Sequence, residues 1–256
     1  QGEAPTSPRS GAMVMSSGNL FALKERSVAV ESLMAIVDEL HRARGAIQAV
    51  LPPSESQRLD HFYSRTVDAA SDLQEHIFHT ASLRLLDLSR YPSRISERRY
   101  DVAEVGVKQS EWVGELVGEV RQFAEKLTVA GVGAATGRLM WNKALDALAQ
   151  ILLEGFSRVR RCTVEGRAAM TLDLQGFIKG TESLSPRDVD AHSKMRIVDN
   201  YIKAFYVPEQ ELVHWAHTHP EYTRTQLVNL VTCIADNNKM KRKALKDLLV
   251  QIESIA

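Results

Sequence analysis

The sequence lacks the features that mark several large classes of protein. It has two cysteines in 256 residues, Cys162 and Cys233, which excludes a disulfide framework and favours a reducing, cytosolic compartment. No signal peptide is found, and no apolar run approaches the roughly 18 residues that a membrane-spanning helix needs. Lysine plus arginine balance aspartate plus glutamate at 32 each. The chain therefore lacks the basic excess that is typical of nucleic-acid-binding domains, and we expect no nucleic-acid partner.

Side chains that could build a catalytic or cofactor site are also scarce. Carboxylates are scattered, and no Ser/His/Asp or Cys/His arrangement can be assembled, so we expect no enzyme and no catalytic residues. Gly131, Gly133 and Gly137 resemble a dinucleotide fingerprint, but the third glycine comes one position late and no strand precedes them. The sequence predicts an interhelical loop there and no cofactor.

Two histidine pairs have the helical spacing of metal ligands: His76 with His79, and His214 with His217. Two imidazoles three residues apart can converge on one ion. No cysteine or carboxylate cluster completes a set of four ligands, however, and histidines near a helix end, like His217 before Pro220, favour capping of the last carbonyl groups. We therefore predict no metal site.

Apolar residues at helical spacing are abundant. Between residues 141 and 159 they recur every three or four positions, which predicts a helix with one continuous apolar stripe on which the other helices pack. The stripe consists of Trp141, Leu145, Leu148, Leu152, Phe156 and Val159. It resumes after Cys162, on a second helix or a kinked continuation, with Met170, Leu174, Phe177 and Ile178.

Prolines divide the rest of the chain into further predicted helices. The first covers about 20–50, with Arg44 at one position of its apolar seam. The second begins at a capping box of Ser54 and Gln57 and ends near Pro92. Its predicted seam is Leu59, Phe62, Thr66, Leu73 and Ile77. The third covers roughly 93–128, and its seam is Val102, Val105, Trp112, Leu116, Val120, Phe123 and Leu127.

The predicted organisation has four parts. Residues 1–19 are rich in glycine, serine and proline and are expected to be a disordered tail or a remnant of expression. Residues 20–180 form a long-helix bundle, 181–194 a polar loop, and 195–256 a short-helix subdomain packed on the bundle, in which Thr223 and Gln226 cap one helix. No alternating strand pattern is found. The predicted fold class is all-α: an elongated antiparallel helical bundle with a short-helix C-terminal cap.

Arg158, Arg160, Arg161 and Arg167 gather where the central helix breaks. They form either a surface salt-bridge network with nearby glutamates, in which each pair contributes only ~0.3–0.5 kcal/mol, or a patch that docks a partner.

A second basic run, near the C-terminus, precedes an amphipathic helix. It comprises Lys239, Lys241, Arg242, Lys243 and Lys246. Five such charges attract an anionic membrane at about 1 kcal/mol each if all of them face it. The run is therefore a candidate for peripheral membrane binding, although the apolar side of its helix fits a core position better.

Lys203 and Tyr206 are a further candidate for partner binding. They lie three residues apart in an aromatic segment, 201–206, of a chain with only 6 % aromatic residues. Tyrosine is enriched at binding hot spots because it combines a large apolar area with a polar tip. The alternative is that Tyr206 packs on Trp215 across the corner at 207–208.

Several segments resemble the syndetin C-terminal family. The most specific is the run Leu153-Glu154-Gly155-Phe156, Val159-Arg160-Arg161-Cys162, Glu165-Gly166-Arg167-Ala168, Met170, Leu172-Asp173, Gln175 and Phe177. Tyr201-Ile202-Lys203-Ala204-Phe205-Tyr206 and Thr225-Gln226-Leu227-Val228-Asn229-Leu230-Val231 match as well. Together with shorter matches upstream, the resemblance covers about residues 27–231.

This resemblance implies a biological role. Syndetin is a subunit of the endosome-associated recycling protein (EARP) complex, a multisubunit vesicle tether, and the family has a helical-rod tethering fold without catalytic residues. The resemblance implies a cytoplasmic protein that is recruited to recycling endosomes and trans-Golgi-derived membranes and helps return cargo to the plasma membrane. Its expected partners are other tethering-complex subunits, with Rab-family GTPases and membrane-fusion proteins as further candidates.

Overall fold

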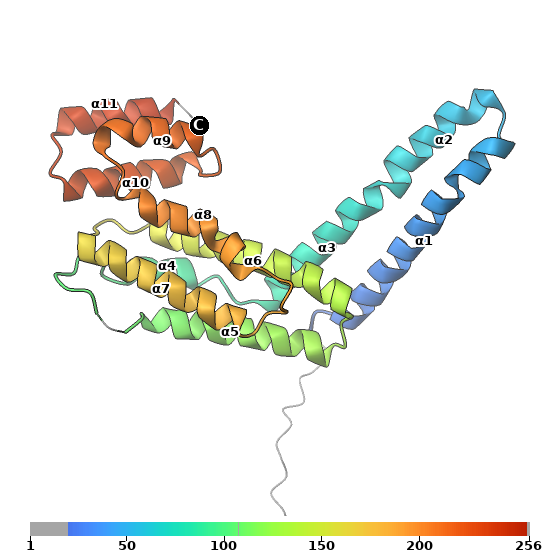
Figure 1. Ribbon diagram of the computed structural model, residues 1–256, viewed down its shortest axis with the longest axis horizontal. Helices are drawn as coiled ribbons and strands as arrows, with labels where there is room; N and C mark the ends of the chain where they lie inside the picture. The colour runs from blue at the N-terminus through green and yellow to red at the C-terminus, as the bar shows by residue number, and fades with distance from the viewer. Residues whose placement is uncertain (1–19, 107, 255–256) are drawn as a thin grey trace, which may run out of the picture.

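The computed structural model describes residues 20–106 and 108–254, so the predicted tail 1–19 lies outside the described residues. The described part is 77 % helical and has no strand. Its one isolated β-bridge joins Tyr100 to Cys162. The helices form an elongated, largely antiparallel assembly (Figure 1). The all-α prediction is confirmed.

The first long helices form an antiparallel hairpin that extends away from the rest of the molecule (Figure 1). Helix α1 spans Leu23–Val50, and a 3-10 turn at Pro53–Glu55 reverses the chain. The returning segment consists of α2 (Ser56–Phe62), a π-helical turn (Tyr63–Val67) and α3 (Ala69–Leu85). We call residues 23–85 the arm. Its outer part has a small core of its own, formed by Val37, Leu59, Tyr63, Val67 and Ala70.

The predicted seam of the second helix is mostly wrong. Its register differs before the π-helical turn begins, since Phe62 is 40 % exposed and Tyr63 is buried. Val67 and Phe78 are buried where Thr66 and Ile77 were expected, although Ile77 packs partly against the core. Leu73 is 47 % exposed. The predicted capping box is also wrong, because Ser54 lies inside the 3-10 turn and α2 has no side-chain cap.

The central body is built around helix α6 (Ala134–Ser157), which packs against α3, α4 and α8. The body also contains α4 (Tyr91–Glu97), α5 (Glu111–Val129), α7 (Val164–Glu182) and α8 (Ala191–Ala204). All six members of the predicted stripe from Trp141 to Val159 are buried, so the central stripe is confirmed. The stripe resumes on the separate helix α7, where Met170, Leu174 and Phe177 are also buried.

The third predicted helix, 93–128, is wrong in its first half. The chain leaves α4 at Glu97 and enters α5 only at Glu111, so Val102 and Val105 do not belong to a helical seam. The intervening segment is held by contacts with a distant part of the chain. The carbonyl of Tyr100 accepts a hydrogen bond from the backbone N–H of Thr163 at 3.0 Å. Periodicity within the segment cannot reveal a contact with residues 60 positions away.

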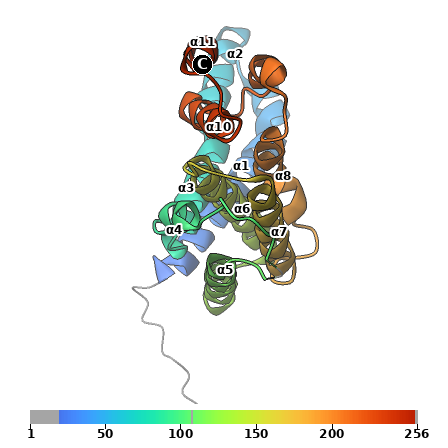
Figure 2. The same cartoon turned by 90° about the vertical axis from the view of Figure 1, so that its left-hand side faces the viewer.

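The last helices form a compact group beside the body, which Figure 2 shows at one end of the molecule. After a 3-10 turn at Glu209–Glu211 come α9 (Leu212–Thr218), α10 (Arg224–Asn237) and α11 (Arg242–Glu253). The predicted capping box of Thr223 and Gln226 is present at the start of α10. Helix α8, whose residues from 195 were assigned to the C-terminal subdomain, packs against α6 and α7. None of the described helices is long and apolar enough to cross a membrane.

Buried phenols and thiols predict that the fold loses stability in alkali. Burial raises the pKa of Cys162 to about 12 and that of Cys233 to about 11, and it also raises the pKa of Tyr100, Tyr201 and Tyr222. In the unfolded chain thiols ionise near pH 8.5 and phenols near pH 10. The folded state retains these protons longer, so its stability is complete below those values and falls as the pH rises through them.

We therefore expect the urea midpoint of unfolding to be level at neutral pH and to fall between about pH 9 and pH 11. A midpoint that stays constant up to pH 11 would contradict the burial of these groups. The variant Cys162→Ala with Cys233→Ala serves as a comparison, since it removes the thiol contribution and should lose less stability between pH 8.5 and pH 9.5.

Candidate functional site

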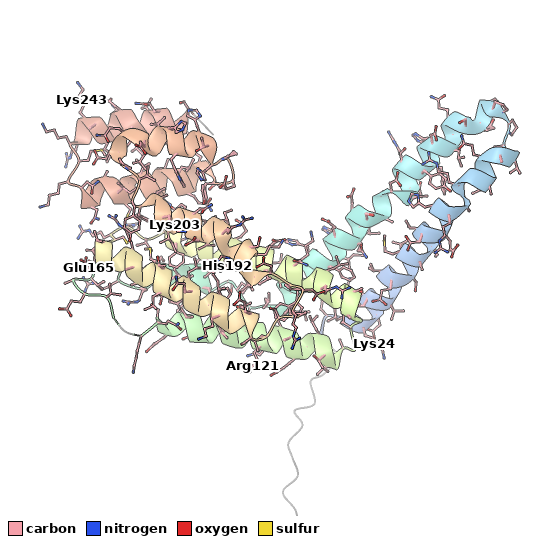
Figure 3. The ribbon with its side chains drawn as sticks, in the orientation of Figure 1. Lys24, Arg121, Glu165, His192, Lys203 and Lys243 are labelled. Carbon is pink, nitrogen blue, oxygen red and sulfur yellow. The ribbon has the colours of Figure 1, made fainter. Side chains whose placement is uncertain are left out.

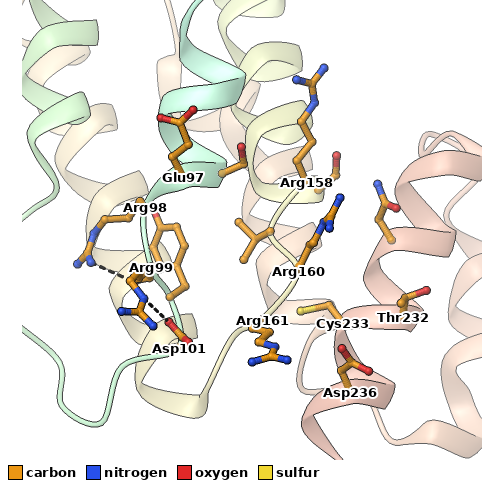
Figure 4. Close-up of a pocket in the computed structure, with 15 residues that line it drawn as sticks. Glu97, Arg98, Arg99, Asp101, Arg158, Arg160, Arg161, Thr232, Cys233 and Asp236 are labelled. Carbon is orange, nitrogen blue, oxygen red and sulfur yellow. Dashed lines mark hydrogen bonds and ion pairs between the residues drawn. The ribbon is translucent and has the colours of Figure 1, made fainter.

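A recess of about 880 Å³ lies between the segment 96–101, the end of α6 with the linker that follows it, and one face of α10 (Figure 4). Five arginines line it: Arg98, Arg99, Arg158, Arg160 and Arg161. We call this recess the arginine groove. It brings three arginines of the predicted cluster together with two that the sequence did not single out.

The linker between α6 and α7 holds two of these arginines toward solvent. Helix α6 ends at Ser157, and the linker after it contains two buried residues, one on either side of an exposed pair. Val159 and Cys162 are 4 % and 1 % exposed, respectively, whereas Arg160 and Arg161 between them are exposed. The two buried side chains anchor the linker in the core on both sides of the arginine pair. The backbone therefore fixes where Arg160 and Arg161 leave the surface.

The segment that carries Arg98 and Arg99 is fastened to the start of α7. Thr163 caps α7 by accepting a hydrogen bond from the N–H of Gly166, and its hydroxyl donates to the carbonyl of Val102 at 2.6 Å. Gly166 allows a very close approach, since a Cβ at this position would lie 1.7 Å from the carbonyl oxygen of Tyr100. The position of this wall of the groove, the segment 96–101, therefore depends on the absence of a side chain at Gly166.

A buried carboxylate fixes the same segment further along. Asp173 on α7 is 2 % exposed and accepts three hydrogen bonds: from the Tyr100 hydroxyl at 2.9 Å, from the Ser110 hydroxyl at 2.6 Å and from the Ser110 N–H at 2.7 Å. Arg98 in turn donates from Nε to the Ser110 hydroxyl oxygen at 2.8 Å. Hydrogen bonds to a charged group are stronger than neutral ones, so this network orients Arg98 at the edge of the groove.

The groove arginines differ in whether an acidic side chain pairs with them. Arg158 pairs with Glu154, Nε to Oε1 at 2.8 Å, and Arg99 pairs with Asp101, Nε to Oδ1 at 3.4 Å. Arg160 and Arg161 form no ion pair and no side-chain hydrogen bond with any other described residue. Exposed pairs contribute little to stability. The charges of Arg160 and Arg161 are therefore available to a ligand.

Arg167 lies apart from the groove. Its side chain is 7 % exposed, and Nη1 donates to the carbonyl oxygen of Phe205 at 2.8 Å. The guanidinium also lies over the ring of Tyr206, 5.0 Å from its centroid. This arginine joins α7 to the end of α8 and offers little surface to a partner.

The Lys203 and Tyr206 side chains both reach solvent. Lys203 pairs with Asp199 one turn earlier, Nζ to Oδ2 at 2.6 Å, and the Tyr206 side chain is 53 % exposed. The Trp215 ring stacks on His219 and Tyr222, with centroids 4.3 and 5.3 Å apart. Tyr206 thus packs on Arg167.

The C-terminal basic run spans the turn between α10 and α11 and the first turns of α11, where Figure 3 labels Lys243. We call it the basic turn. All five of its side chains, Lys239, Lys241, Arg242, Lys243 and Lys246, are exposed. Lys239 has a positive φ of 53°, and Lys241 is the N-cap of α11. The turn begins three residues after Asp236, which lines the groove, so groove and basic turn are neighbours along the chain.

Neither histidine pair has the partners that a metal would need. Among the described residues no group of three or more histidine, cysteine, aspartate or glutamate side chains could hold an ion. His76 and His79 lie in α3 beside Lys143 in a shallow recess. His219 instead stacks on Trp215 and contacts the carbonyl oxygen of that residue at 2.8 Å.

The comparisons with known proteins agree on one family. The family described as "Syndetin, C-terminal" matches residues 20–253. The chain belongs to the syndetin C-terminal family. The resemblance in the run from Leu153 to Phe177 is thereby confirmed, and in the structure this run forms the end of α6, the arginine linker and most of α7.

Individual syndetins match over nearly the whole chain. Syndetin of Gallus gallus is 29 % identical over 259 residues, which cover 99 % of this chain and 27 % of that protein. Syndetins of Rattus norvegicus and Mus musculus are each 30 % identical over 249 residues, covering 95 % of this chain and 25 % of theirs. The chain thus spans about a quarter of the length of these relatives. No solved structure matches it.

Proposed function

We propose that this chain is a non-catalytic part of a multisubunit vesicle-tethering complex that acts in the endosomal recycling of cargo to the plasma membrane. The match of residues 20–253 to the syndetin C-terminal family carries this proposal. In this role the protein is cytoplasmic and is recruited to recycling endosomes and trans-Golgi-derived membranes. Its partners are the other subunits of the complex, with Rab-family GTPases and membrane-fusion proteins as further candidates.

The shape of the molecule supports a role in holding partners. The arm and the C-terminal helices leave the central body in different directions (Figure 1), so surfaces on the two parts lie well apart. A tether that keeps two binding surfaces at a set separation raises the local concentration of what each of them binds. The arm also exposes large apolar side chains, including Ile36, Phe62 and Leu73 at 58 %, 40 % and 47 %, as protein-binding surfaces often do.

Affinity capture tests this role. The chain is immobilised and incubated with cytosol, and the bound proteins are identified by mass spectrometry. We expect other tethering-complex subunits among them, and fewer of these subunits on the variant Arg160→Glu with Arg161→Glu. A control variant, Lys24→Glu with Arg121→Glu, makes the same change in net charge at exposed sites away from the groove (Figure 3). Capture of no tethering subunit by the unaltered chain would overturn the proposal.

A specific feature of α11 favours a second candidate function, peripheral binding to anionic membranes. Arg242 and Lys243 lie in the first turn of α11, which contains no acidic residue. Cations are unfavourable at this end of a helix, by ~0.3–1 kcal/mol each, because they face the positive end of its dipole. An anionic surface would relieve this repulsion. Co-sedimentation with vesicles that contain phosphatidylserine, at low and high salt, tests the idea, because lipid binding by this turn must weaken with salt.

A further inference from the structure

We infer that the arginine groove binds an acidic peptide segment of a partner protein and that Arg160 and Arg161 are the receptors for its carboxylates. The inference rests on the proposed function in one respect only, namely that this chain binds proteins. Charge, side-chain chemistry and shape support it independently.

The charge balance of the groove favours an anionic ligand. Five arginines line it against three acidic residues, Glu97, Asp101 and Asp236. Asp101 already neutralises Arg99, and Arg158 is neutralised by Glu154, which lies outside the lining. Arg98 has no ion pair but donates hydrogen bonds to the Ser110 hydroxyl and the Arg99 carbonyl. The remaining two, Arg160 and Arg161, make neither kind of contact with another described residue and are adjacent in sequence and exposed. Figure 4 shows these two side chains pointing in different directions, so each can attract a carboxylate of its own.

The kind of cation points to carboxylates. A guanidinium is planar and presents its N–H donors as a fork that matches the two oxygens of a carboxylate. The linker anchors at Val159 and Cys162 fix the backbone that carries the two forks, so less conformational entropy is lost when they bind. Figure 4 shows Arg160 and Arg161 between the segment 98–101 and the face of α10.

The opposite wall offers hydrogen bonds suited to a peptide backbone. Asn229, Thr232 and Asp236 lie on one face of α10 and line the groove. The Asn229 amide makes no side-chain hydrogen bond with any described residue, and the Thr232 hydroxyl donates to Val228 and keeps its own acceptor capacity. An extended peptide has alternating N–H and C=O groups that need such partners. The Asp236 carboxylate can accept from a peptide N–H at the end of the groove.

The shape of the site distinguishes a peptide from a bilayer. Arg160 and Arg161 line a recess of about 880 Å³, a volume within the usual range of ligand pockets, about 300–1,000 Å³. A peptide segment can enter a recess of this kind, whereas the surface of a bilayer reaches protruding parts of a protein more readily. The basic turn at Lys239–Lys246 lies at the outer end of the C-terminal helices, where Figure 3 labels Lys243. The groove and the turn therefore suit different ligands.

Binding of a defined peptide tests the inference. The probe is a fluorescein-labelled peptide of eight glutamates, with a peptide of eight glutamines as the neutral comparison, and fluorescence anisotropy gives the Kd at 50 and 300 mM salt. We expect the intact chain to bind the glutamate peptide, more weakly at the higher salt. The variant Arg160→Gln with Arg161→Gln should weaken binding at least about tenfold, because both carboxylate receptors are lost. The control Lys24→Gln with Arg121→Gln, which has the same net charge, should change Kd less than about twofold.

Far-ultraviolet circular dichroism verifies that each variant is folded, and both substituted arginines are exposed side chains without described partners. Failure of the glutamate peptide to bind, or equal losses in the groove variant and its control, would overturn the inference. The inference would also be overturned if Arg160 and Arg161 were required for binding to vesicles and the peptide did not bind. If tethering subunits are captured equally well by the groove variant, only this inference is overturned. If the glutamate peptide binds but no tethering subunit is captured, only the proposed function is overturned.

Discussion

Gly166→Ala is expected to destabilise the fold by about 4 kcal/mol or more, in the exceptional range for a single substitution. The added Cβ would meet the carbonyl oxygen, the carbonyl carbon and the Cα of Tyr100 at 1.7, 2.7 and 3.2 Å. These are backbone atoms, so no side chain can rotate away to make room. Relief requires the segment 98–102 to separate from α7, which breaks the Thr163 hydrogen bonds and exposes Tyr100. Urea denaturation followed by circular dichroism measures the loss.

A second glycine provides the matched control. Gly114 lies within α5, and a Cβ there would have no other heavy atom within 4 Å. Gly114→Ala should therefore stabilise the protein by about 0.5–1 kcal/mol, through the better helix propensity of alanine. If the two substitutions have similar effects, the contact between Tyr100 and Gly166 is absent in solution.

Phe156→Ala should cost about 3–5 kcal/mol, the range found when a buried aromatic ring is truncated. The ring is completely buried near the end of α6. Its centroid lies 6.1 Å from that of Tyr100 and 6.0 Å from that of Trp112, so α6, α5 and the segment 98–110 would all border the cavity. We expect the same urea experiment to show a large fall in the midpoint with little change in slope.

Phe62→Ala removes the same side chain from the surface of the arm, where the ring is 40 % exposed. It should cost clearly less than Phe156→Ala, because 40 % of the area of this residue already faces water. A loss for Phe156→Ala no larger than that for Phe62→Ala would contradict the position of Phe156 in the core.

The periodic parts of the chain were predictable because one local rule governs them. Residues buried on one face of a helix must recur every three or four positions, and Trp141 to Phe156 follow this spacing without interruption. The rule does not decide between neighbours that both fit the spacing. Phe62 lies three and Tyr63 four residues after Leu59, and the structure buries Tyr63.

The segment 98–110 was missed for a different reason. Its conformation depends on Thr163, Gly166 and Asp173, all more than 50 residues further along the chain. Two of the five groove arginines were missed with it, since Arg98 and Arg99 were assigned to a helix. Within the predicted cluster, sequence proximity grouped Arg167 with its neighbours although it is buried. A useful signal in the sequence was the apolar residue on each side of the pair, Val159 and Cys162, which identifies Arg160 and Arg161 as the outward pair.

The arm has one further consequence, for cooperativity. Its outer part depends on a separate core of five buried residues, while the body depends on the much larger core around α6. Small clusters of this kind open with a lower free energy than the main core, and they can open without it. A partner that binds the outer arm therefore shifts the local equilibrium of the arm first. The recess beside α10 can stay intact through such an event, so occupancy at one end of the molecule need not alter affinity at the other.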